Sequence, residues 1–308
     1  MIVAESQDWK GEMHDVIAVG IDGSRPSRAA IRWGVRRAAI IGGSVKLIAV
    51  VGPERISQVA EMTSQRAEGS ALAVLDRSAL LEEETLYARS LDAGVTITTE
   101  QLSGNPMWEL VDASAAADLI AIGTHKTGFI HGSLFGSSSM HLAAAAHCPV
   151  VIVPEANEPQ HSREVVAGAD DSLGGSAAVR FAAAEAELRG GALTLVRAWS
   201  LPESAELLPR CLSREQYLRN ESANVLQSAL AIAKSAHPHL HVRLRNIQCE
   251  PAAALLNASR SACLVVIGSS GTRSEQAILL GTVSHDLLLN IVRPTAIVHP
   301  DTASAQGV

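Results

Sequence analysis

Aromatic residues are scarce in this sequence, which has three Phe, two Tyr and four Trp in 308 residues. Aromatic side chains make up 3% of the chain, whereas apolar residues as a whole make up 47%. The core must therefore be built from Ala, Val, Leu and Ile, which is typical of parallel strands covered by Ala-rich helices. The same scarcity argues against base-stacking platforms for single-stranded nucleic acid. The composition indicates an α/β protein.

Positive charge and long apolar runs are also lacking. Lys and Arg number 25 against 32 Asp and Glu, giving a formal net charge of −7. A broad nucleic-acid-binding face needs the opposite balance, so no nucleic-acid partner is expected. No run approaches the roughly 18 to 20 apolar residues of a membrane span, and charged residues interrupt the first twelve positions. We therefore expect a cytoplasmic protein without a membrane partner.

Closely spaced cysteines and several well-known site motifs are missing as well. The four cysteines lie far apart without a CxxC pair, so neither a disulfide framework nor a zinc site is encoded. The patterns GxxxxGK[ST], GxGxxG and GxSxG do not occur. This argues against a P-loop nucleotidase, a dinucleotide fold of the usual fingerprint and an α/β-hydrolase.

The sequence does contain an internal duplication. Three segments recur in the same order, the first 148 positions later and the other two 145 positions later. They are IAVGIDGS at 17–24 and VVAGADDS at 165–172, LIAIGTHK at 119–126 and LVVIGSSG at 264–271, and LFGSSS at 134–139 and LLGTVS at 279–284. Self-similarity of this kind indicates repeated structural units. A chain of this length accommodates two domains of about 150 residues each.

Both repeats alternate short apolar runs with longer segments of helical periodicity. In the first repeat the expected strands are 17–21, 45–51, 95–102, 119–123 and 150–153, and the expected helices are 27–41, 65–91, one opening at Asn105-Pro106, and 137–147. In the second the strands are 165 onward, 193–199, 242–247, 264–268 and 296–299, and the helices are 174–189, 214–237, 251–261 and 283–291. The limits of these predicted elements divide the chain into an N-terminal tail at 1–13, domains at 14–154 and 164–300, a polar linker at 155–163 and a C-terminal tail at 301–308.

Strands that alternate with helices predict right-handed crossovers and a parallel sheet. The fold class is therefore α/β, with two tandem Rossmann-like domains, each a mainly parallel five-stranded sheet between helices. An apolar sheet edge must be covered, so we expect the final strands, 150–153 and 296–299, to pair within the chain around a pseudo-twofold axis.

Ligands of an open parallel sheet bind at the carboxyl ends of the strands, where Asp22 and Asp170 stand. In the second repeat the loop after the fourth strand has the pattern G-x2-G-x9-G-[ST]. Its members are Gly268, Gly271, Gly281 and Thr282, followed by Val283. The glycines permit close backbone approach, and a helix opening at Gly281-Thr282 offers free N–H groups to phosphate. The alternative interpretation is a tight strand-to-helix connection without a ligand.

The combination of these motifs resembles the universal stress protein family, in its nucleotide-binding branch, over essentially both repeats. Members of this family share the adenine nucleotide α-hydrolase-like fold, and the resemblance also implies further association into a homodimer. The resemblance implies that the aspartates and the ends of the second strands, Val50 and Ala198, contact adenosine. It also implies that the glycines and Ser/Thr hold ribose and phosphates, often with Mg²⁺ or Mn²⁺. The corresponding residues of the first repeat are Gly123, Lys126, Gly136, Ser137 and Ser138.

Each repeat departs from this pattern at one position. Lys126 replaces the second loop glycine of the first repeat, where its side chain blocks backbone approach, pairs with phosphate or is simply solvated. Asp171 replaces the glycine that follows the first aspartate, which is Gly23 in the first repeat. Its carboxylate repels phosphate, helps to hold a divalent metal, or simply favours the start of a helix. The intact loop makes the second repeat the preferred site.

Three functions remain open from the sequence. The first is a regulatory protein of the stress response that binds ATP, with an adenine nucleotide as its partner. The second is a ligand-free interaction module that acts through dimerisation, with an unidentified protein partner. The third is slow ATP hydrolysis or nucleotidyl transfer, for which the sequence offers no convincing general base, so we expect no true enzyme.

Overall fold

The computed structural model describes residues 15–53, 77–124, 137–155, 162–201, 211–269 and 280–300. The first repeat contains β1 (Val16–Ile21), α1 (Arg25–Ile41), β2 (Ser44–Val51), α4 (Ser78–Leu91), β3 (Thr96–Ser103), α5 (Pro106–Ala113), β4 (Leu119–Thr124), α6 (Ser137–Ala145) and β5 (Val150–Pro154). The second contains β6 (Val165–Gly168), α7 (Leu173–Leu188), β7 (Ala192–Trp199), α8 (Cys211–Ala236), β8 (His241–Gln248), α9 (Pro251–Ala258), β9 (Leu264–Gly268), α10 (Thr282–Leu289) and β10 (Thr295–Val298). The predicted alternation of strands and helices is confirmed in both repeats.

Local sequence signals explain where these helices begin and end. Ser24 caps α1 by accepting a hydrogen bond from the Ser27 N–H, and Gly42 ends the helix in the left-handed conformation with φ 70°. Asn105 caps α5 in the predicted way, with its side chain accepting from the Met107 N–H. The expected helix over 251–261 is shorter, because it ends at Ala258 and continues as a 3₁₀ turn.

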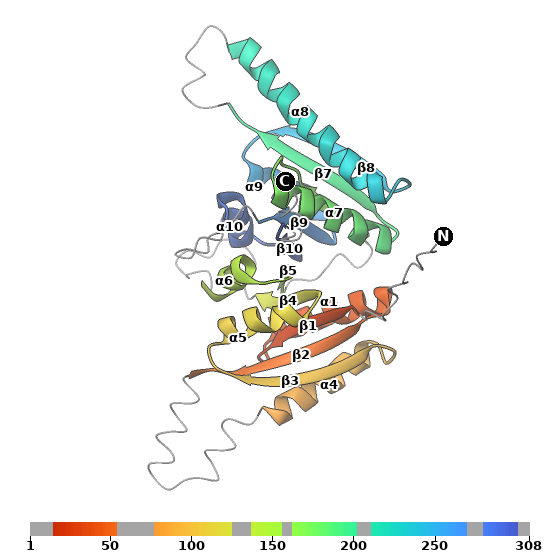
Figure 1. Cartoon of the computed structure of the whole chain (residues 1–308), viewed down its shortest axis with the longest axis vertical. Coiled ribbons are helices and arrows are strands. Elements are labelled where there is room, and N and C mark those ends of the chain that lie inside the picture. Colours follow the sequence, from red (N-terminus) through yellow and green to blue (C-terminus); the bar gives the residue numbers. More distant parts are fainter. Residues whose placement is uncertain are drawn as a thin grey trace, which may run out of the picture.

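The described strands form one ten-stranded sheet in the order β3-β2-β1-β4-β5-β10-β9-β6-β7-β8. Each repeat contributes five parallel strands, and the two halves join where β5 runs antiparallel to β10. In that pairing Val151 lies opposite Ala296. The predicted intrachain pairing of the final strands is therefore confirmed. Figure 1 shows the first repeat below and the second above this central pair of strands.

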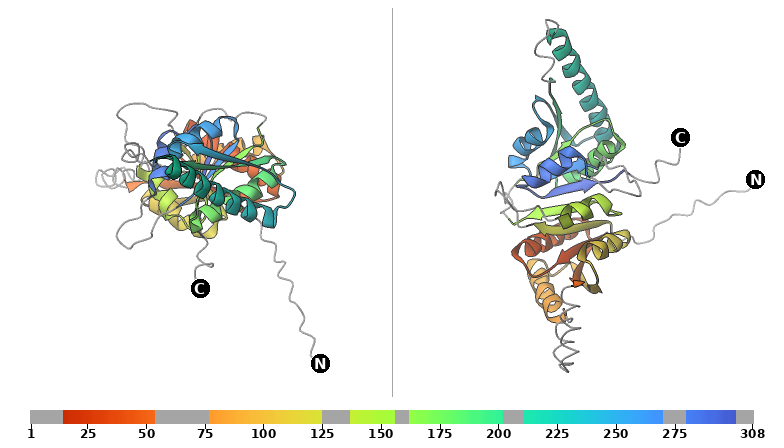
Figure 2. Two further views of the ribbon diagram at one scale, coloured as in Figure 1. Left: turned by 90° about the horizontal axis from the view of Figure 1, so that it is seen from above. Right: turned by 90° about the vertical axis from the view of Figure 1, so that its left-hand side faces the viewer.

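Helices cover both faces of the sheet, as the side view in Figure 2 shows. One apolar cluster joins the sheet to α1, α4, α7 and α8, and the other joins it to α5, α6, α9 and α10. Each cluster contains side chains of both repeats. Trp33, one of the few aromatic residues, is buried in the first cluster. The hydrophobic core is thus continuous across the junction of the two repeats.

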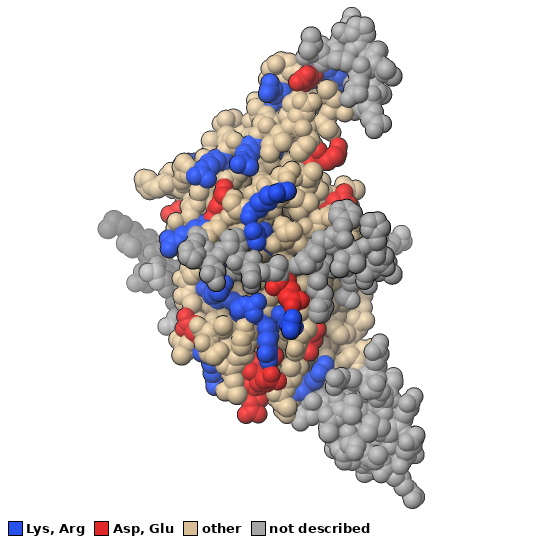
Figure 3. All heavy atoms as spheres, turned by 180° about the vertical axis from the view of Figure 1, so that it is seen from behind, with Lys and Arg blue, Asp and Glu red and all other residues tan. Residues whose placement is uncertain are grey.

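The surface of the described residues carries both signs of charge. On the face drawn in Figure 3, Lys and Arg lie among Asp and Glu and do not form one broad basic field. Among the helices that the structure describes, none has the length and apolar character that crossing a bilayer requires.

Candidate functional site

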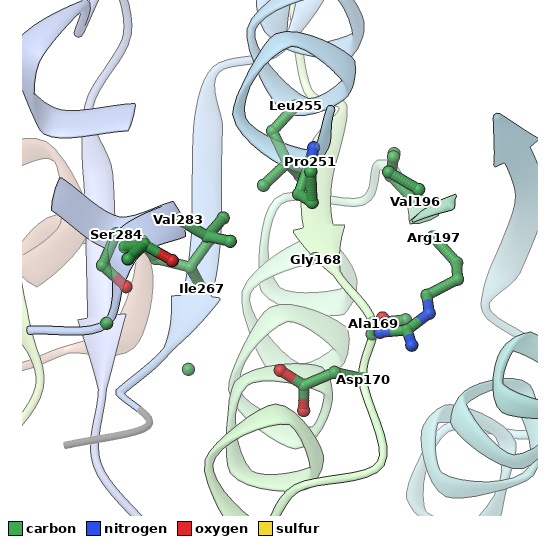
Figure 4. Close-up of a pocket in the computed structure, with 14 residues that line it drawn as sticks. Gly168, Ala169, Asp170, Val196, Arg197, Pro251, Leu255, Ile267, Val283 and Ser284 are labelled. Carbon is green, nitrogen blue, oxygen red and sulfur yellow. Dashed lines mark hydrogen bonds between the residues drawn. The ribbon is translucent and has the colours of Figure 1, made fainter. Parts of the chain in front are cut away.

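A cavity opens in the second repeat at the carboxyl ends of β6, β7 and β9 (Figure 4). Its volume is about 160 Å³. Residues from five segments line it: the end of β6 and the turn after it, the end of β7, the start of α9, the end of β9, and the start of α10. They are Gly168, Ala169, Asp170, Val196, Arg197, Ala198, Pro251, Leu255, Ile267, Gly268, Gly281, Thr282, Val283 and Ser284. This is the position at which a parallel sheet offers strand ends and helix N-termini to a ligand.

An equivalent cavity in the first repeat has a volume of about 560 Å³. Its lining follows the same plan, with strand ends on one side and the start of α5 on the other. The residues are Gly20, Ile21, Asp22, Ser24, Ile48, Val50, Gly52, Pro53, Arg77, Asn105, Pro106, Met107, Leu110, Ile122, Gly123 and Ser139. The volume lies within the range of about 300–1,000 Å³ that is usual for small-molecule pockets.

The two aspartates are held in the same way by the turn that follows the first strand of each repeat. Asp170 Oδ1 accepts hydrogen bonds from the Ser172 N–H at 2.9 Å and the Ser172 hydroxyl at 2.5 Å. Asp22 Oδ1 accepts from the Ser24 N–H at 2.9 Å. In each carboxylate the second oxygen has no hydrogen-bond partner among the described residues. One acceptor per repeat is therefore free to receive a ligand hydroxyl.

Gly123 and Gly268 end their strands against the first turn of a helix. A Cβ on Gly268 would lie 2.3 Å from the Gly174 carbonyl carbon, and one on Gly123 would lie 2.1 Å from the carbonyl carbon of Pro26. Both distances are far shorter than a carbon–carbon contact allows. Both glycines line a cavity, but close packing of the strand on the helix already explains why each is a glycine. The presence of glycine at these two positions therefore does not require the close approach of a ligand that the sequence predicted.

The start of α10 presents backbone N–H groups beside the second cavity. Gly281 is its N-cap residue, and Thr282, Val283 and Ser284 form the first turn, in which the N–H groups have no intrahelical partner. The Ser284 side chain is buried, whereas Thr282 is exposed. A helix N-terminus with open N–H groups is suited to hold an anionic group such as phosphate.

Most of the predicted site residues within the described ranges lie together. Asp170, Ala198, Gly268, Gly281, Thr282 and Val283 line the second cavity, and Asp22, Val50 and Gly123 line the first. Ser137 and Ser138 begin α6, and the neighbouring Ser139 lines the first cavity. Gly271, Lys126 and Gly136 lie outside the described residues. Asp171 is exposed and does not line the second cavity, so its side chain stands apart from Asp170.

Sequence reasoning predicted α5 and α9 but missed that each of these helices closes a cavity on the side away from the glycine loop. Pro106 and Leu110 of α5 line the first cavity, and Pro251 and Leu255 of α9 line the second. A signal was available, because the offset of 145 positions that relates the loops also relates these two pairs. Arg77 and Arg197 were also missed, and each is the single basic side chain in the described lining of its cavity.

The described residues contain no group of three or more His, Cys, Asp or Glu that could hold a metal ion. A Mg²⁺ or Mn²⁺ ion bound with a nucleotide does not require such a group, since phosphate oxygens and one or two carboxylates commonly hold it. The described lining of each cavity contains one carboxylate, from Asp22 in the first repeat and from Asp170 in the second.

Comparison with known proteins supplies the family. The model of the universal stress protein family matches residues 13–154 and 161–299. A universal stress protein of Mycolicibacterium smegmatis is 29% identical over 293 residues, with 92% of this chain and 97% of that protein covered. One from Mycobacterium tuberculosis is 30% identical over 286 residues, with 90% and 94% covered.

Solved structures show the same fold at low sequence identity. A universal stress protein of Archaeoglobus fulgidus aligns with a TM-score of 0.67 at 15% identity, covering 94% of this chain and 99% of that one. A putative universal stress protein of Pseudomonas aeruginosa aligns with a TM-score of 0.60 at 16% identity, covering 96% of each chain. With two matched family regions, a continuous ten-stranded sheet and one cavity per repeat, this chain belongs to the universal stress protein family as a tandem two-domain member.

Proposed function

We propose that this protein binds adenine nucleotides, with ATP as the expected ligand, and acts as a regulatory nucleotide binder in the stress response. The observation that carries the proposal is the recurrence of one arrangement in both repeats. In each repeat a cavity is surrounded by the carboxyl ends of the strands, an apolar wall and an aspartate with one carboxylate oxygen that accepts no hydrogen bond from the described residues.

Each part of the cavity matches one part of a nucleotide. The free oxygen of the aspartate suits a ribose hydroxyl, and the open N–H groups at the start of α10 suit phosphate. The apolar wall of Val196, Pro251 and Leu255 suits the faces of a purine base. In the first repeat Ile48, Pro106 and Leu110 form the corresponding wall.

Two observations favour different repeats as the nucleotide site. The intact glycine pattern favours the second repeat, whereas the larger cavity favours the first. Isothermal titration of the full chain with Mg-ATP gives the number of sites. Nucleotide extracted from the purified protein and identified by mass spectrometry gives the natural ligand. No adenine nucleotide in the extract and no heat of binding would refute the proposal.

Gly281→Asp tests the phosphate end of the second site with little risk to folding. Gly281 has φ −60° and ψ 157°, a conformation open to any residue, and Asp is a favourable N-cap. A carboxylate there repels phosphate by ~1–4 kcal/mol at contact distance, so we expect at least about tenfold weaker ATP binding at this site. Gly281→Asn is the matched control, since it has the same shape and capping ability without the charge.

A ligand-free interaction module is the second candidate function. Its support is the smaller cavity of the second repeat and the departures at Lys126 and Asp171. The regulatory output of such a module would be unchanged in Gly281→Asp, whereas that of a nucleotide-dependent regulator would be lost. Sedimentation of the full chain with and without Mg-ATP tests whether a homodimer forms and whether it responds to nucleotide.

A further inference from the structure

The aspartate of the second repeat is tied to the start of α7 by the hydroxyl of Ser172. This hydroxyl donates to Asp170 Oδ1 at 2.5 Å and accepts from the Gly175 N–H at 2.9 Å. A contact this short between a hydroxyl and a carboxylate is among the stronger hydrogen bonds of proteins. The Ser172 N–H donates to the same oxygen at 2.9 Å. Two donors of one residue therefore hold Oδ1 against the first turn of the helix.

Gly175 leaves the space that this carboxylate occupies. A Cβ at this position would lie 2.0 Å from Asp170 Oδ1, and the three atoms nearest to it all belong to Asp170. Gly175 lies in the first turn of α7, where glycine is less favourable than alanine. Backbone packing explains the neighbouring Gly174, since a Cβ there would lie 2.4 Å from the Ser269 carbonyl oxygen. Room for the aspartate is what explains Gly175.

The first repeat holds its aspartate less firmly. The residue 148 positions before Gly175 is Ser27, which is buried and has a Cβ, so the place that Asp170 Oδ1 takes is filled there. The Ser24 hydroxyl accepts from the Ser27 N–H at 3.3 Å but forms no hydrogen bond with Asp22, which contacts only the Ser24 N–H. Asp22 is exposed, whereas Asp170 is partly buried. Within the described residues, only the second repeat fixes its carboxylate through a side chain.

The fixed carboxylate faces the cavity. Figure 4 shows Asp170 pointing to the side of the cavity on which Val283 and Ser284 lie. Its second oxygen accepts no hydrogen bond from the described residues. The next step rests on the proposed function, in which this oxygen accepts a hydrogen bond from a ribose hydroxyl. A carboxylate that is already ordered loses less side-chain entropy when the ligand binds, so its position is part of the affinity.

We propose that Ser172 and Gly175 are positioning residues that fix Asp170 for a ribose hydroxyl, and that the second repeat thereby selects ribonucleotides over deoxyribonucleotides. A site built to pair with a substrate hydroxyl rejects the analogue that lacks it, because a desolvated polar group is then left without a partner. The exposed carboxylate of Asp22 is solvated when the hydroxyl is missing, so the first repeat discriminates less.

The test compares Mg-ATP with its 2′-deoxy and 3′-deoxy analogues by titration calorimetry on the full chain with Asp22→Ala, which removes the proposed ribose ligand of the first repeat. We expect ATP to bind at least about tenfold more tightly than one of the analogues, as for a hydrogen bond to a charged group. Gly175→Ala puts a methyl group where Oδ1 lies and should abolish this preference by displacing the carboxylate. Ser172→Ala should also abolish it, whereas Ser172→Thr keeps the hydroxyl and should retain it.

Ser176→Ala is the matched control, because Ser176 also lies near the start of α7 but forms no hydrogen bond with Asp170 and does not line the cavity. It should leave the preference unchanged. Equal binding of ATP and both analogues to the Asp22→Ala protein would overturn the proposed selectivity and leave the proposed function standing. A preference that survives in both Gly175→Ala and Ser172→Ala would overturn the positioning role. Loss of all binding in Asp22→Ala would also overturn the inference, since the second repeat would then take no nucleotide. Absence of nucleotide binding to the unsubstituted chain would refute the proposed function and this inference with it.

Discussion

Arg37 and Glu185 occupy equivalent positions in the two repeats and bind each other across the interface between them. They lie 148 residues apart, which is the offset of the duplication in this part of the chain, and their Nε and Oε1 atoms are 2.7 Å apart. Arg189 contacts the other oxygen of Glu185 at 2.8 Å. A residue on a twofold axis meets its own copy. Two identical repeats would therefore place like charges here, and the divergence of the repeats has replaced them with opposite charges.

Glu185→Ala should destabilise the protein strongly. The Glu185 side chain is 2% exposed and the Arg37 side chain 12%, so the substitution leaves two cations in a poorly hydrated interface. Breaking a buried pair by removing one partner costs about 3–5 kcal/mol. Urea unfolding followed by circular dichroism measures the free energy of unfolding. Arg37→Ala should cost less, because Glu185 keeps Arg189 as a partner.

Arg180→Ala serves as the control for charge removal, since Arg180 is exposed on the same helix as Glu185. Its effect should stay within about 0.5 kcal/mol, as for most surface substitutions. If Glu185→Ala and Arg180→Ala changed the free energy of unfolding by equally small amounts, the buried ion pair would not stabilise the protein.

The same pair should determine which halves of the protein associate. A homodimer of the first repeat would place Arg37 against Arg37, and one of the second would place Glu185 against Glu185. Like charges at close range are repulsive, whereas the mixed pair restores the native contact and the β5–β10 pairing. Native mass spectrometry of the two halves expressed together should show a mixed dimer as the main species. Predominance of the two homodimers would contradict this prediction.

Much of the architecture could be predicted because the sequence repeats itself. The duplicated IAVGIDGS and VVAGADDS segments identified both first strands, and Gly42 and Asn105 signalled helix boundaries through local backbone chemistry. The pairing of β5 with β10 followed from the need to cover an apolar strand edge. These predictions depend on local sequence or on the internal repeat, so a single sequence is sufficient to make them.

The parts of the site that were missed depend on tertiary contacts. Nothing near Gly268 in the sequence reveals that the backbone of Gly174 fills the space beside it. Arg197 follows a run of buried strand residues, and only the assembled sheet places it at a cavity. Leu255 reads as an ordinary apolar residue of an amphipathic helix, and packing decides that it also lines the site.

Cys148 should be chemically inert in the folded protein. Burial, and next the charge of Asp118, raises the pKa of its thiol to about 12, so the reactive thiolate is absent near neutral pH. Because the folded-state pKa lies above the unfolded value, the protein loses stability as the pH rises from 9 toward 12. Alkylation with iodoacetamide at pH 8, analysed by peptide mass spectrometry, should leave Cys148 unmodified until urea is added. Rapid modification of Cys148 in the native protein would show that the site is open to solvent.

Gly268→Ala should destabilise the second repeat even though it adds only one methyl group. The new Cβ would lie 2.3 Å from the Gly174 carbonyl carbon and 2.6 Å from the Gly175 nitrogen, and both are backbone atoms that cannot rotate away. Relief requires the end of β9 to move from the first turn of α7, and overpacking of this kind costs about 1–3 kcal/mol. Gly168→Ala is a matched control at the same cavity, since its nearest neighbours are side-chain carbons at 3.5 Å, an ordinary contact distance. Urea unfolding should therefore separate the two variants by at least about 1 kcal/mol. Equal stabilities would mean that β9 and α7 are not packed this closely, and Gly268 would then be explained better by close approach of a ligand.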